Sequence, residues 1–141
     1  MTTISPSSPF HCDQLISTNG KKAERIDCND LSVAIVNSLT KMARLGREER
    51  CGFLTNTGAI YQILNGHEEP THNFFMEKEA VREAVEEIYQ ISHDHISAIW
   101  HTHPNNIPWP SPRDIHGWPN LALGWRYFIV THSEVLEWKL V

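Results

Sequence analysis

The segment HISAIWHTHPNNIPWPSPRD, residues 95–114, is the part of the chain that best predicts the fold. Its first nine residues are apolar and branched enough to predict a buried strand, which ends with His101 and His103. Side chains two positions apart on a strand point to the same face, about 6.6 Å apart along the chain. On a helix the same spacing would place them on different sides. The two imidazoles can therefore meet at one ion only if this segment is a strand.

The loop after this strand is stiffened by proline and leads to a carboxylate. Four prolines lie within residues 104–112, and each ring fixes φ at about −65°, which lowers the entropy lost when the loop becomes ordered. Such a loop can hold the Asp114 carboxylate against the two strand histidines. A catalytic zinc usually has three protein ligands and an open fourth position, so the segment is a candidate three-ligand metal site.

Simpler interpretations of these residues remain open. The sequence SPRD at residues 111–114 is also a good helix start, with serine as N-cap, proline at N1 and an acid at N3. Aspartate is short for the reciprocal bond of a capping box, which would leave the Asp114 carboxylate freer for other contacts. A second histidine pair, His93 and His95, has the same spacing, but it lies among polar residues and no acidic residue follows it in a rigid loop.

The rest of the chain predicts a mixed α/β or α+β sheet with helices on its faces. Apolar periodicity, caps and turn residues define the elements. Helices are expected between an N-cap at Asp30 and a stop at Gly46, over about residues 77–91, and from residue 111 to about 123. Strands are expected over residues 50–56, 58–66 and 95–103 and twice within 125–141, with turns at residues 56–58 and 132–133.

Composition and charge narrow the classes of partner and compartment. A length of 141 residues suggests a single domain, expected over residues 29–141 after a flexible or irregular arm of residues 1–28. The net charge of −5 argues against nucleic acid or an anionic membrane as a main partner. No apolar run reaches the roughly 18 residues of a membrane span, and the N-terminus lacks the pattern of a signal peptide. Cys12, Cys28 and Cys51 have no CxxC spacing, so we expect no disulfide framework and a reducing, cytoplasmic compartment.

Taken together, these residues resemble the signature of the JAMM (MPN-plus, or JAB domain) zinc metalloproteases. His101-x-His103 is followed by seven residues and then by Ser111-x-x-Asp114, which matches the family pattern. The family often has serine or threonine between the histidines, proline after the second histidine and proline before the serine, and this chain has all three. The combination is far more specific than the histidine pair alone.

A glutamate upstream completes the resemblance. The family carries it near the start of a strand in a Glu-x-x-Gly setting, and the sequence EERCGFL supplies Glu49 and Gly52. Glu48 is the alternative glutamate by proximity. The similarity runs from about Asp30 to the C-terminus and includes the order helix, strand pair, helix, strand, metal loop, helix and strands.

The resemblance implies a fold and a set of residue roles. Residues 29–141 would form a JAMM-type metalloprotease domain with a JAB-type, cytidine-deaminase-like α/β fold, whose central mixed sheet is flanked by helices. The implied ligands of one zinc ion (Zn2+) per chain are His101, His103 and Asp114. Glu49 would be the general base for the zinc-activated water, and Ser111 would help to hold the oxyanion of the tetrahedral intermediate.

The resemblance also implies an enzyme that hydrolyses an amide or isopeptide bond in a protein tail or linker. Its partner would be a protein or peptide, such as a ubiquitin-like or phage tail protein. The segment REERCGFLTNTGAIYQILN and the Asn-Phe-Phe after it are most similar to the bacterial and phage tail-assembly branch, which implies the cytosol of a bacterium or infected host, or the virion. The alternative is a non-catalytic zinc-containing assembly or binding module, in which the ion only shapes a binding surface.

Overall fold

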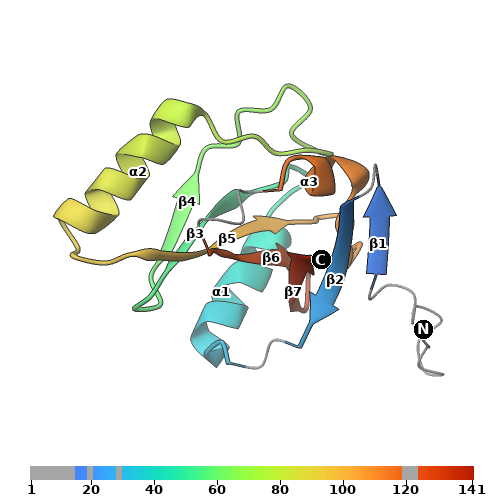
Figure 1. Cartoon of the computed structure of the whole chain (residues 1–141), viewed down its shortest axis with the longest axis horizontal. Coiled ribbons are helices and arrows are strands. Elements are labelled where there is room, and N and C mark those ends of the chain that lie inside the picture. The colour runs from blue at the N-terminus through green and yellow to red at the C-terminus, as the bar shows by residue number, and fades with distance from the viewer. Residues whose placement is uncertain (1–14, 19–20, 28–29, 119–123) are drawn as a thin grey trace.

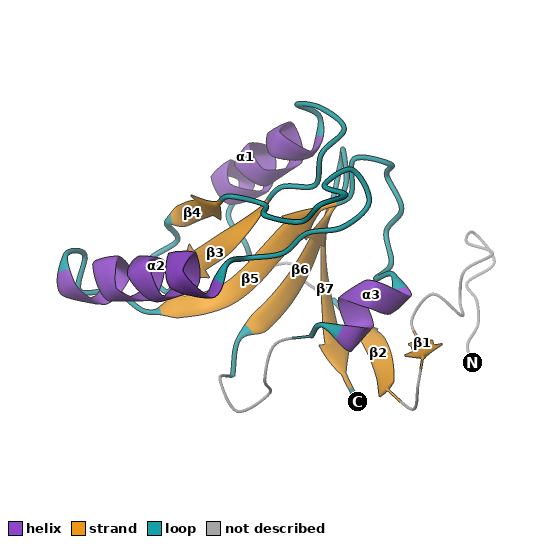
Figure 2. Cartoon of the chain, turned by 90° about the horizontal axis from the view of Figure 1, so that it is seen from above, coloured by secondary structure: helices purple, strands orange, loops and turns teal. Residues whose placement is uncertain are grey.

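One seven-stranded β-sheet forms the centre of the computed structural model, which describes residues 15–18, 21–27, 30–118 and 124–141. The strands are β1 (Leu15–Thr18), β2 (Lys21–Ile26), β3 (Cys51–Thr55), β4 (Ile60–Ile63), β5 (Ile96–Thr102), β6 (Arg126–Val130) and β7 (Val135–Leu140). The helices are α1 (Val33–Ala43), α2 (Lys78–Gln90) and α3 (Pro112–His116). Helix α1 covers one face of the sheet, and α2 and α3 lie over the other (Figures 1 and 2).

The sheet is mixed, which confirms the predicted α/β class. The strand order is β1-β2-β7-β6-β5-β3-β4. Among these strands, β5 and β6 pair in parallel, and every other neighbouring pair is antiparallel. A parallel pair needs a crossover connection, because the chain must return to the starting edge of the sheet. The connection from β5 to β6 contains the proline loop and α3, so this crossover brings the loop back over the sheet.

Strand β5 lies inside the sheet, between β3 and β6, and is buried on both faces. Ala98 and Trp100 belong to the core beneath α1, whereas Ile99 belongs to the core beneath α2 and α3. Side chains alternate along a strand, so His101 shares the face of Ile99, and there it meets the ring of Tyr127. A strand buried on both faces is mostly apolar, and the run of residues 96–100 has this character, so the strand can be identified from its sequence.

The N-cap of helix α1 lies two residues after the predicted one. The hydroxyl of Ser32 accepts the backbone N–H of Ile35 at 3.1 Å, so Ser32 is the N-cap. The prediction of Asp30 was wrong because its carboxylate accepts two hydrogen bonds from the Arg126 guanidinium, both at 2.8 Å. The helix also ends before the predicted stop at Gly46.

Helix α2 agrees with the predicted helix over about residues 77–91. Helical spacing gives it an apolar stripe, only part of which is buried, that consists of Val81, Ala84, Val85, Ile88 and Ile91. Val81 packs on the sheet and Ile88 is buried. Val85 and Ile91, which the apolar pattern placed on the same stripe, are exposed. None of the helices in the described part of the chain is long and apolar enough to cross a membrane.

Helix α3 is shorter than the predicted range of residues 111–123. It ends at His116, with Gly117 as the C-cap. The ring of Trp118 then stacks on Tyr127, with ring centroids 3.8 Å apart, so the chain turns onto the sheet instead of continuing the helix. Residues 119–123 lie outside the described part of the chain.

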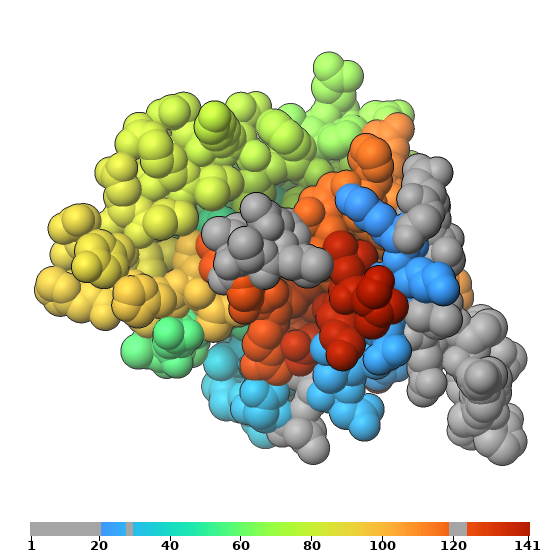
Figure 3. Space-filling model, viewed as in Figure 1, coloured from blue at the N-terminus to red at the C-terminus, as the bar shows by residue number. Residues whose placement is uncertain are grey.

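Strands β1 and β2 form where we expected an irregular arm. Strand β2 pairs antiparallel with β7, Ala23 lies opposite Leu140, and Ala23 is fully buried. Figure 3 shows the red residues at the C-terminal end against the blue residues of β2. The sequence of β2, KKAERI, has little strand pattern of its own, and its partner β7 lies at the other end of the chain. Residues 1–14, 19–20 and 28 of the predicted arm lie outside the described residues.

The β3–β4 hairpin forms with the turn that the sequence predicts. Gly58 has φ of 90°, a conformation that favours glycine, and donates its N–H to the Thr55 carbonyl at 3.0 Å. The hydroxyl of Thr57 donates to the carboxylate of Asp94, which ties the turn to the start of β5. The predicted turn at residues 132–133 likewise joins β6 and β7.

Gly52 marks the place where β3 approaches its neighbours most closely. A Cβ atom at this position would lie 1.8 Å from the Tyr61 carbonyl oxygen of β4 and 2.8 Å from the Trp100 ring of β5. Neither a paired backbone nor a fully buried indole can move far, because protein interiors are close-packed. The glycine three residues after Glu49 is therefore required by the packing of the sheet.

We expect Gly52→Ala to lower the free energy of unfolding by at least about 2 kcal/mol, because an overpacked core typically costs about 1–3 kcal/mol or more. Urea denaturation of wild type and variant measures the difference. Gly46→Ala is the matched control, since a Cβ atom there meets nothing within 4 Å, and we expect a change within about 0.5 kcal/mol. Equal stability of Gly52→Ala and Gly46→Ala would contradict the prediction.

Candidate metal centre

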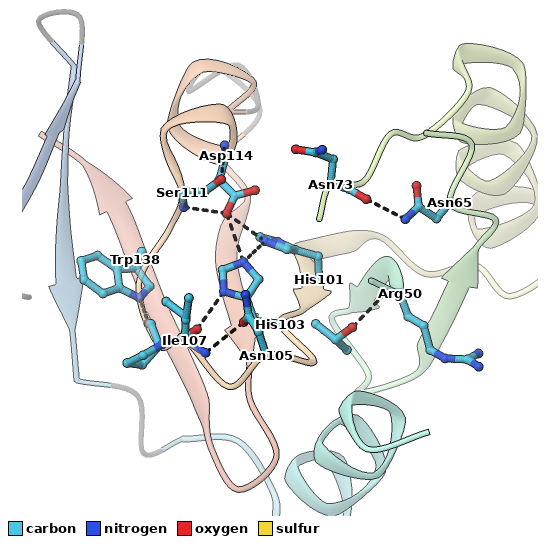
Figure 4. A network of polar contacts seen from close by, with 12 residues as sticks. Arg50, Asn65, Asn73, His101, His103, Asn105, Ile107, Ser111, Asp114 and Trp138 are labelled. Atoms are coloured by element: carbon cyan, nitrogen blue, oxygen red, sulfur yellow. Dashed lines mark hydrogen bonds and ion pairs between the residues drawn. The ribbon is translucent and has the colours of Figure 1, made fainter. Parts of the chain in front are cut away.

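Four buried side chains converge at the end of β5. Glu49 lies just before β3, His101 and His103 lie at the end of β5, and Asp114 lies in α3. Their ligand atoms all lie within 4.8 Å of one another. Glu49 is 5% exposed, His101 0%, His103 4% and Asp114 8%, so the group is shielded from bulk solvent. In Figure 4, the side chains of His101, His103 and Asp114 point toward one another.

The two histidines direct the same nitrogen at the centre. The Nε2 atoms of His101 and His103 lie 3.0 Å apart, and Asp114 Oδ2 lies 3.3 and 3.1 Å from them. In a tetrahedral zinc site with Zn–N distances of about 2.0–2.1 Å, neighbouring ligand atoms lie about 3.3 Å apart. The three atoms are therefore spaced like three corners of one tetrahedron.

A complete capping box positions Asp114. The Ser111 hydroxyl accepts the backbone N–H of Asp114 at 3.1 Å, and Asp114 Oδ2 accepts the backbone N–H of Ser111 at 2.8 Å. Our expectation that aspartate is too short for the reciprocal bond was wrong. The same oxygen, Oδ2, also faces the two imidazoles. The helix cap and the metal-site geometry are thus one arrangement, not alternatives.

The register between β3 and β5 positions Glu49. Cys51 lies opposite His101 in this antiparallel pair, so the next pair on the same face is Glu49 and His103. The pairing continues past the strand end, because the Thr102 N–H donates to the Arg50 carbonyl at 2.8 Å. Glu48, the alternative glutamate, is exposed, so the structure brings Glu49 rather than Glu48 to the centre.

The side-chain amide of Asn65 fixes the backbone around Glu49, and sequence reasoning missed it. The Asn65 amide nitrogen donates to the Glu49 carbonyl at 2.8 Å. It also donates to the Asn73 carbonyl at 2.9 Å, as Figure 4 shows. Its oxygen accepts the Phe75 N–H at 3.1 Å, and the Glu49 N–H donates to the Pro70 carbonyl at 2.7 Å. No local pattern marks Asn65, since each of these partners is brought to it by the fold.

Two further contacts orient the imidazoles. His103 Nδ1 lies 2.8 Å from the Ile107 carbonyl oxygen, which can accept a hydrogen bond from Nδ1–H and so leave the Nε2 lone pair facing the centre. The ring of Phe74 stacks on His101, with centroids 4.3 Å apart. Sequence reasoning missed both roles, because a backbone carbonyl has no sequence signature and Phe74 entered only as part of a family-like segment.

Burial and charge shift the pKa values of all four side chains of the centre. Burial lowers the pKa of His103, but the Asp114 carboxylate outweighs it and holds the pKa above its ordinary value. Burial lowers the pKa of His101, although Asp114 opposes this shift, so His101 favours the neutral form that binds a metal. Burial raises the pKa of Asp114, but the two imidazoles outweigh it and hold the pKa below its ordinary value. Burial raises the pKa of Glu49 to about 8, with His103 opposing the shift and Asp114 adding to it.

The residues of the centre fit a divalent metal. Glu49 Oε1 is buried and has no hydrogen-bond partner among the described residues. A buried carboxylate oxygen without a partner is costly, and a nearby cation would compensate for it. Two imidazoles and a carboxylate are also a donor set found in catalytic zinc sites. The group of Glu49, His101, His103 and Asp114 could therefore hold a metal ion such as zinc.

Ser111 borders a cavity of about 340 Å³ beside the centre. Glu49 and His103 line the same cavity, together with Trp109 and Pro110. Ser111 is thus both the cap of α3 and part of a cavity wall.

The second histidine pair does not form a comparable group. His93 and His95 are exposed, and among the described residues the one cluster suited to a metal is that at the end of β5. Asp94 between them is buried and structural. Hydrogen bonds from the Thr57 side chain and the His95 backbone lower the pKa of Asp94 to about 2.

Cys51 lies next to the centre but does not suit a ligand role. It is opposite His101 in the sheet, and its thiol donates to the Ile63 carbonyl at 3.5 Å. Burial, with a contribution from Glu49, raises the pKa of the Cys51 thiol to about 12. A thiol binds a metal as the thiolate, so Cys51 remains outside the candidate ligand set.

We expect zinc to stabilise the protein through this centre. At free zinc about a hundredfold above Kd, binding to the native state raises the free energy of unfolding by about 2.7 kcal/mol. Urea denaturation with zinc and with a chelator measures the gain, and elemental analysis should give about one ion per chain. His103→Ala should lose the gain, whereas His95→Ala, which removes an exposed histidine, should keep it. An equal gain in both variants would place the ion elsewhere.

Comparison with known proteins identifies the family. The family model for prokaryotic homologues of the JAB domain matches residues 34–141, which include the whole candidate metal centre. The solution structure of protein DSY2949 from Desulfitobacterium hafniense has a similar fold, with a TM-score of 0.56 and 21% identity over 74% of this chain and 75% of that chain. No curated protein matches the chain. The chain therefore belongs to the family of prokaryotic homologues of the JAB domain.

Proposed function

We propose that this protein is a zinc-dependent metallopeptidase or isopeptidase that hydrolyses an amide bond in a protein tail or linker. One observation underlies the proposal: a buried glutamate, two histidines and an aspartate meet at one point beside a cavity. Membership of the prokaryotic JAB family supports it.

His101, His103 and Asp114 would hold the metal, because their three inward atoms already converge. Bound zinc supplies a Lewis acid that allows water to attack a carbonyl carbon near neutral pH. Three protein ligands leave a fourth position open for that chemistry. Glu49 lies beside the three ligands, and its Oε1 makes no hydrogen bond among the described residues. This oxygen is therefore available to accept a proton.

Glu49 would move the proton in this reaction. Glu49 lines the cavity that Ser111 and His103 also border, so it lies beside the space where a peptide bond can lie. Burial raises its pKa to about 8, and a cation nearby would lower the pKa again, toward the range in which a general base works at neutral pH. Glu49 accepts a proton from the attacking water and returns it to the departing amine.

Ser111 would stabilise the oxyanion. Its oxygen accepts the Asp114 N–H, which leaves the hydroxyl hydrogen available to donate toward the cavity. The capping box holds the serine in place before the substrate arrives, so little reorganisation is needed during the reaction. A donor that is preorganised in this way favours the transition state over the ground state.

The proposed substrates are a ubiquitin-like tail and a phage assembly protein, met in the cytosol of a bacterium or infected host, or in the virion. Both suggestions rest on the resemblance of the sequence to the JAMM family. The second candidate function is a zinc-containing assembly module without catalysis. Such a module would have the same metal centre as the peptidase but would not hydrolyse any bond.

We expect Glu49→Gln to lower the rate of amide hydrolysis by about 10²–10⁴-fold, because that is the usual contribution of a general base. Glu48→Gln is the matched control, since Glu48 is exposed and should leave the rate unchanged. Mass spectrometry after incubation with a ubiquitin-like fusion and a peptide library detects cleavage. A zinc-loaded wild type that cuts none of these substrates would favour the assembly module.

We expect Ser111→Gly to lower kcat by about 10²–10³-fold, which is the usual effect of removing one oxyanion donor. Glycine serves as an N-cap nearly as well as serine, so α3 should remain folded. Ser111→Thr keeps both the cap and the hydroxyl and is the matched control. If both variants retain the wild-type kcat on a cleaved peptide, Ser111 acts only as a helix cap.

A further inference from the structure

A larger cavity borders the candidate metal centre on the side of Asp114. Its volume is about 580 Å³, within the range of about 300–1,000 Å³ typical of ligand pockets. We refer to it as the Trp125 pocket, whose apolar walls are Phe53, Phe74, Met76, Val81, Ile99 and Trp125.

The Trp125 pocket shares residues with the metal centre. Asp114 lines the pocket and also directs Oδ2 at the two imidazoles. Phe74 lines the pocket and stacks on His101, with ring centroids 4.3 Å apart. A group that fills the pocket therefore lies directly beside two of the candidate ligands.

The walls of the pocket are already in place. Phe53 and Ile99 come from β3 and β5, and both are buried in the sheet. The segment with Phe74 and Met76 is held to the end of β4, because Asn65 Oδ1 accepts the Phe75 N–H at 3.1 Å. The Gly66 N–H also donates to the Phe75 carbonyl at 2.8 Å. A preformed apolar pocket costs little ordering free energy on binding.

Polar groups around the pocket suit a peptide with an acidic residue. Arg113 of α3 and His67, which follows β4, both line the pocket, and Arg113 Nη1 lies 3.4 Å from His67 Nε2. An arginine there favours a carboxylate nearby. Asn73 also lines the pocket, and in Figure 4 its side-chain amide extends toward the Asp114 side of the centre, where it can bind a peptide group.

We propose that the Trp125 pocket holds a large apolar side chain of the substrate, at a residue close to the bond that is cut and beside an acidic residue. The proposal rests on the proposed function and deepens it, since it names the substrate class of that site. A tail that ends in glycine alone would leave these apolar walls exposed to water. The pocket therefore selects phenylalanine or leucine over small or polar residues.

Binding of two matched peptides, measured without cleavage, tests this proposal. Zinc-loaded Glu49→Gln protein is titrated with acetyl-Ala-Asp-Phe-Ala-Ala-amide and with the same peptide carrying asparagine instead of phenylalanine. Two-dimensional NMR of the labelled protein follows the Trp125 indole N–H. We expect shifts at Trp125 and a Kd at least about tenfold lower for the phenylalanine peptide, since burying such a side chain is strongly favourable.

A pair of variants on α2 locates the binding site. Val81→Phe places a ring in the pocket from its wall. It should raise the Kd of the phenylalanine peptide by about tenfold or more, because the pocket then has no room for both rings. Val85 lies one turn further on, outside the pocket and exposed, so Val85→Phe should leave the Kd of the phenylalanine peptide within about twofold of wild type. The dispersion of the NMR spectrum shows that both variants are folded.

Three outcomes would overturn the proposal: equal Kd values for the two peptides, shifts that avoid Trp125, or no binding of the phenylalanine peptide at millimolar concentration. Cleavage by wild type is scored separately. If wild type cuts proteins while the two peptides bind equally, the proposed function stands and the pocket assignment fails. If the phenylalanine peptide binds at Trp125 and wild type cuts nothing, the pocket is a binding site and the peptidase proposal fails.

Discussion

The antiparallel register between β3 and β5 is the constraint on which the candidate metal centre depends. It sets Cys51 opposite His101 and carries Glu49 to His103, on the face that α3 approaches. A slip of one residue would turn both histidines to the face of α1, because side chains alternate along a strand. Gly52 makes this register possible, since any side chain there would meet the Tyr61 carbonyl and the Trp100 ring.

The ionisable side chains of the centre are buried together, and this shared burial shifts their pKa values. Asp114 stays ionised between two imidazoles, while the pKa of Glu49 rises to about 8. Asn65 connects this chemistry to the neighbouring pocket, because one amide holds the backbone of Glu49 and the segment that carries Phe74. The backbone at the centre and the pocket wall are therefore held by hydrogen bonds of the same side chain.

Elements with a strong local sequence pattern were predicted correctly. The apolar run before His101 is a strand, the Asn56-Thr57-Gly58 turn joins a hairpin, and residues 78–90 form a helix. Predictions failed in two situations. In one, a residue far away in the sequence bound a side chain that was expected to cap a helix. In the other, a distant strand supplied the hydrogen-bonding partner of a segment with no strand pattern of its own. Asp30 does not cap α1 because it pairs with Arg126, and β2 exists because β7 pairs with it.

The sequence by itself determined the fold class and the candidate ligands, since the His-x-His spacing and the capping residues at 111–114 act within a few positions of the chain. Only the tertiary structure decided which glutamate reaches the centre, how the imidazoles are oriented and where the pocket lies. Glu49 and Glu48 are adjacent and chemically identical, and the register buries Glu49 and exposes Glu48. Likewise, the Ile107 carbonyl and the ring of Phe74 orient histidines through contacts that form when the loops pack, and such contacts leave no pattern in the sequence.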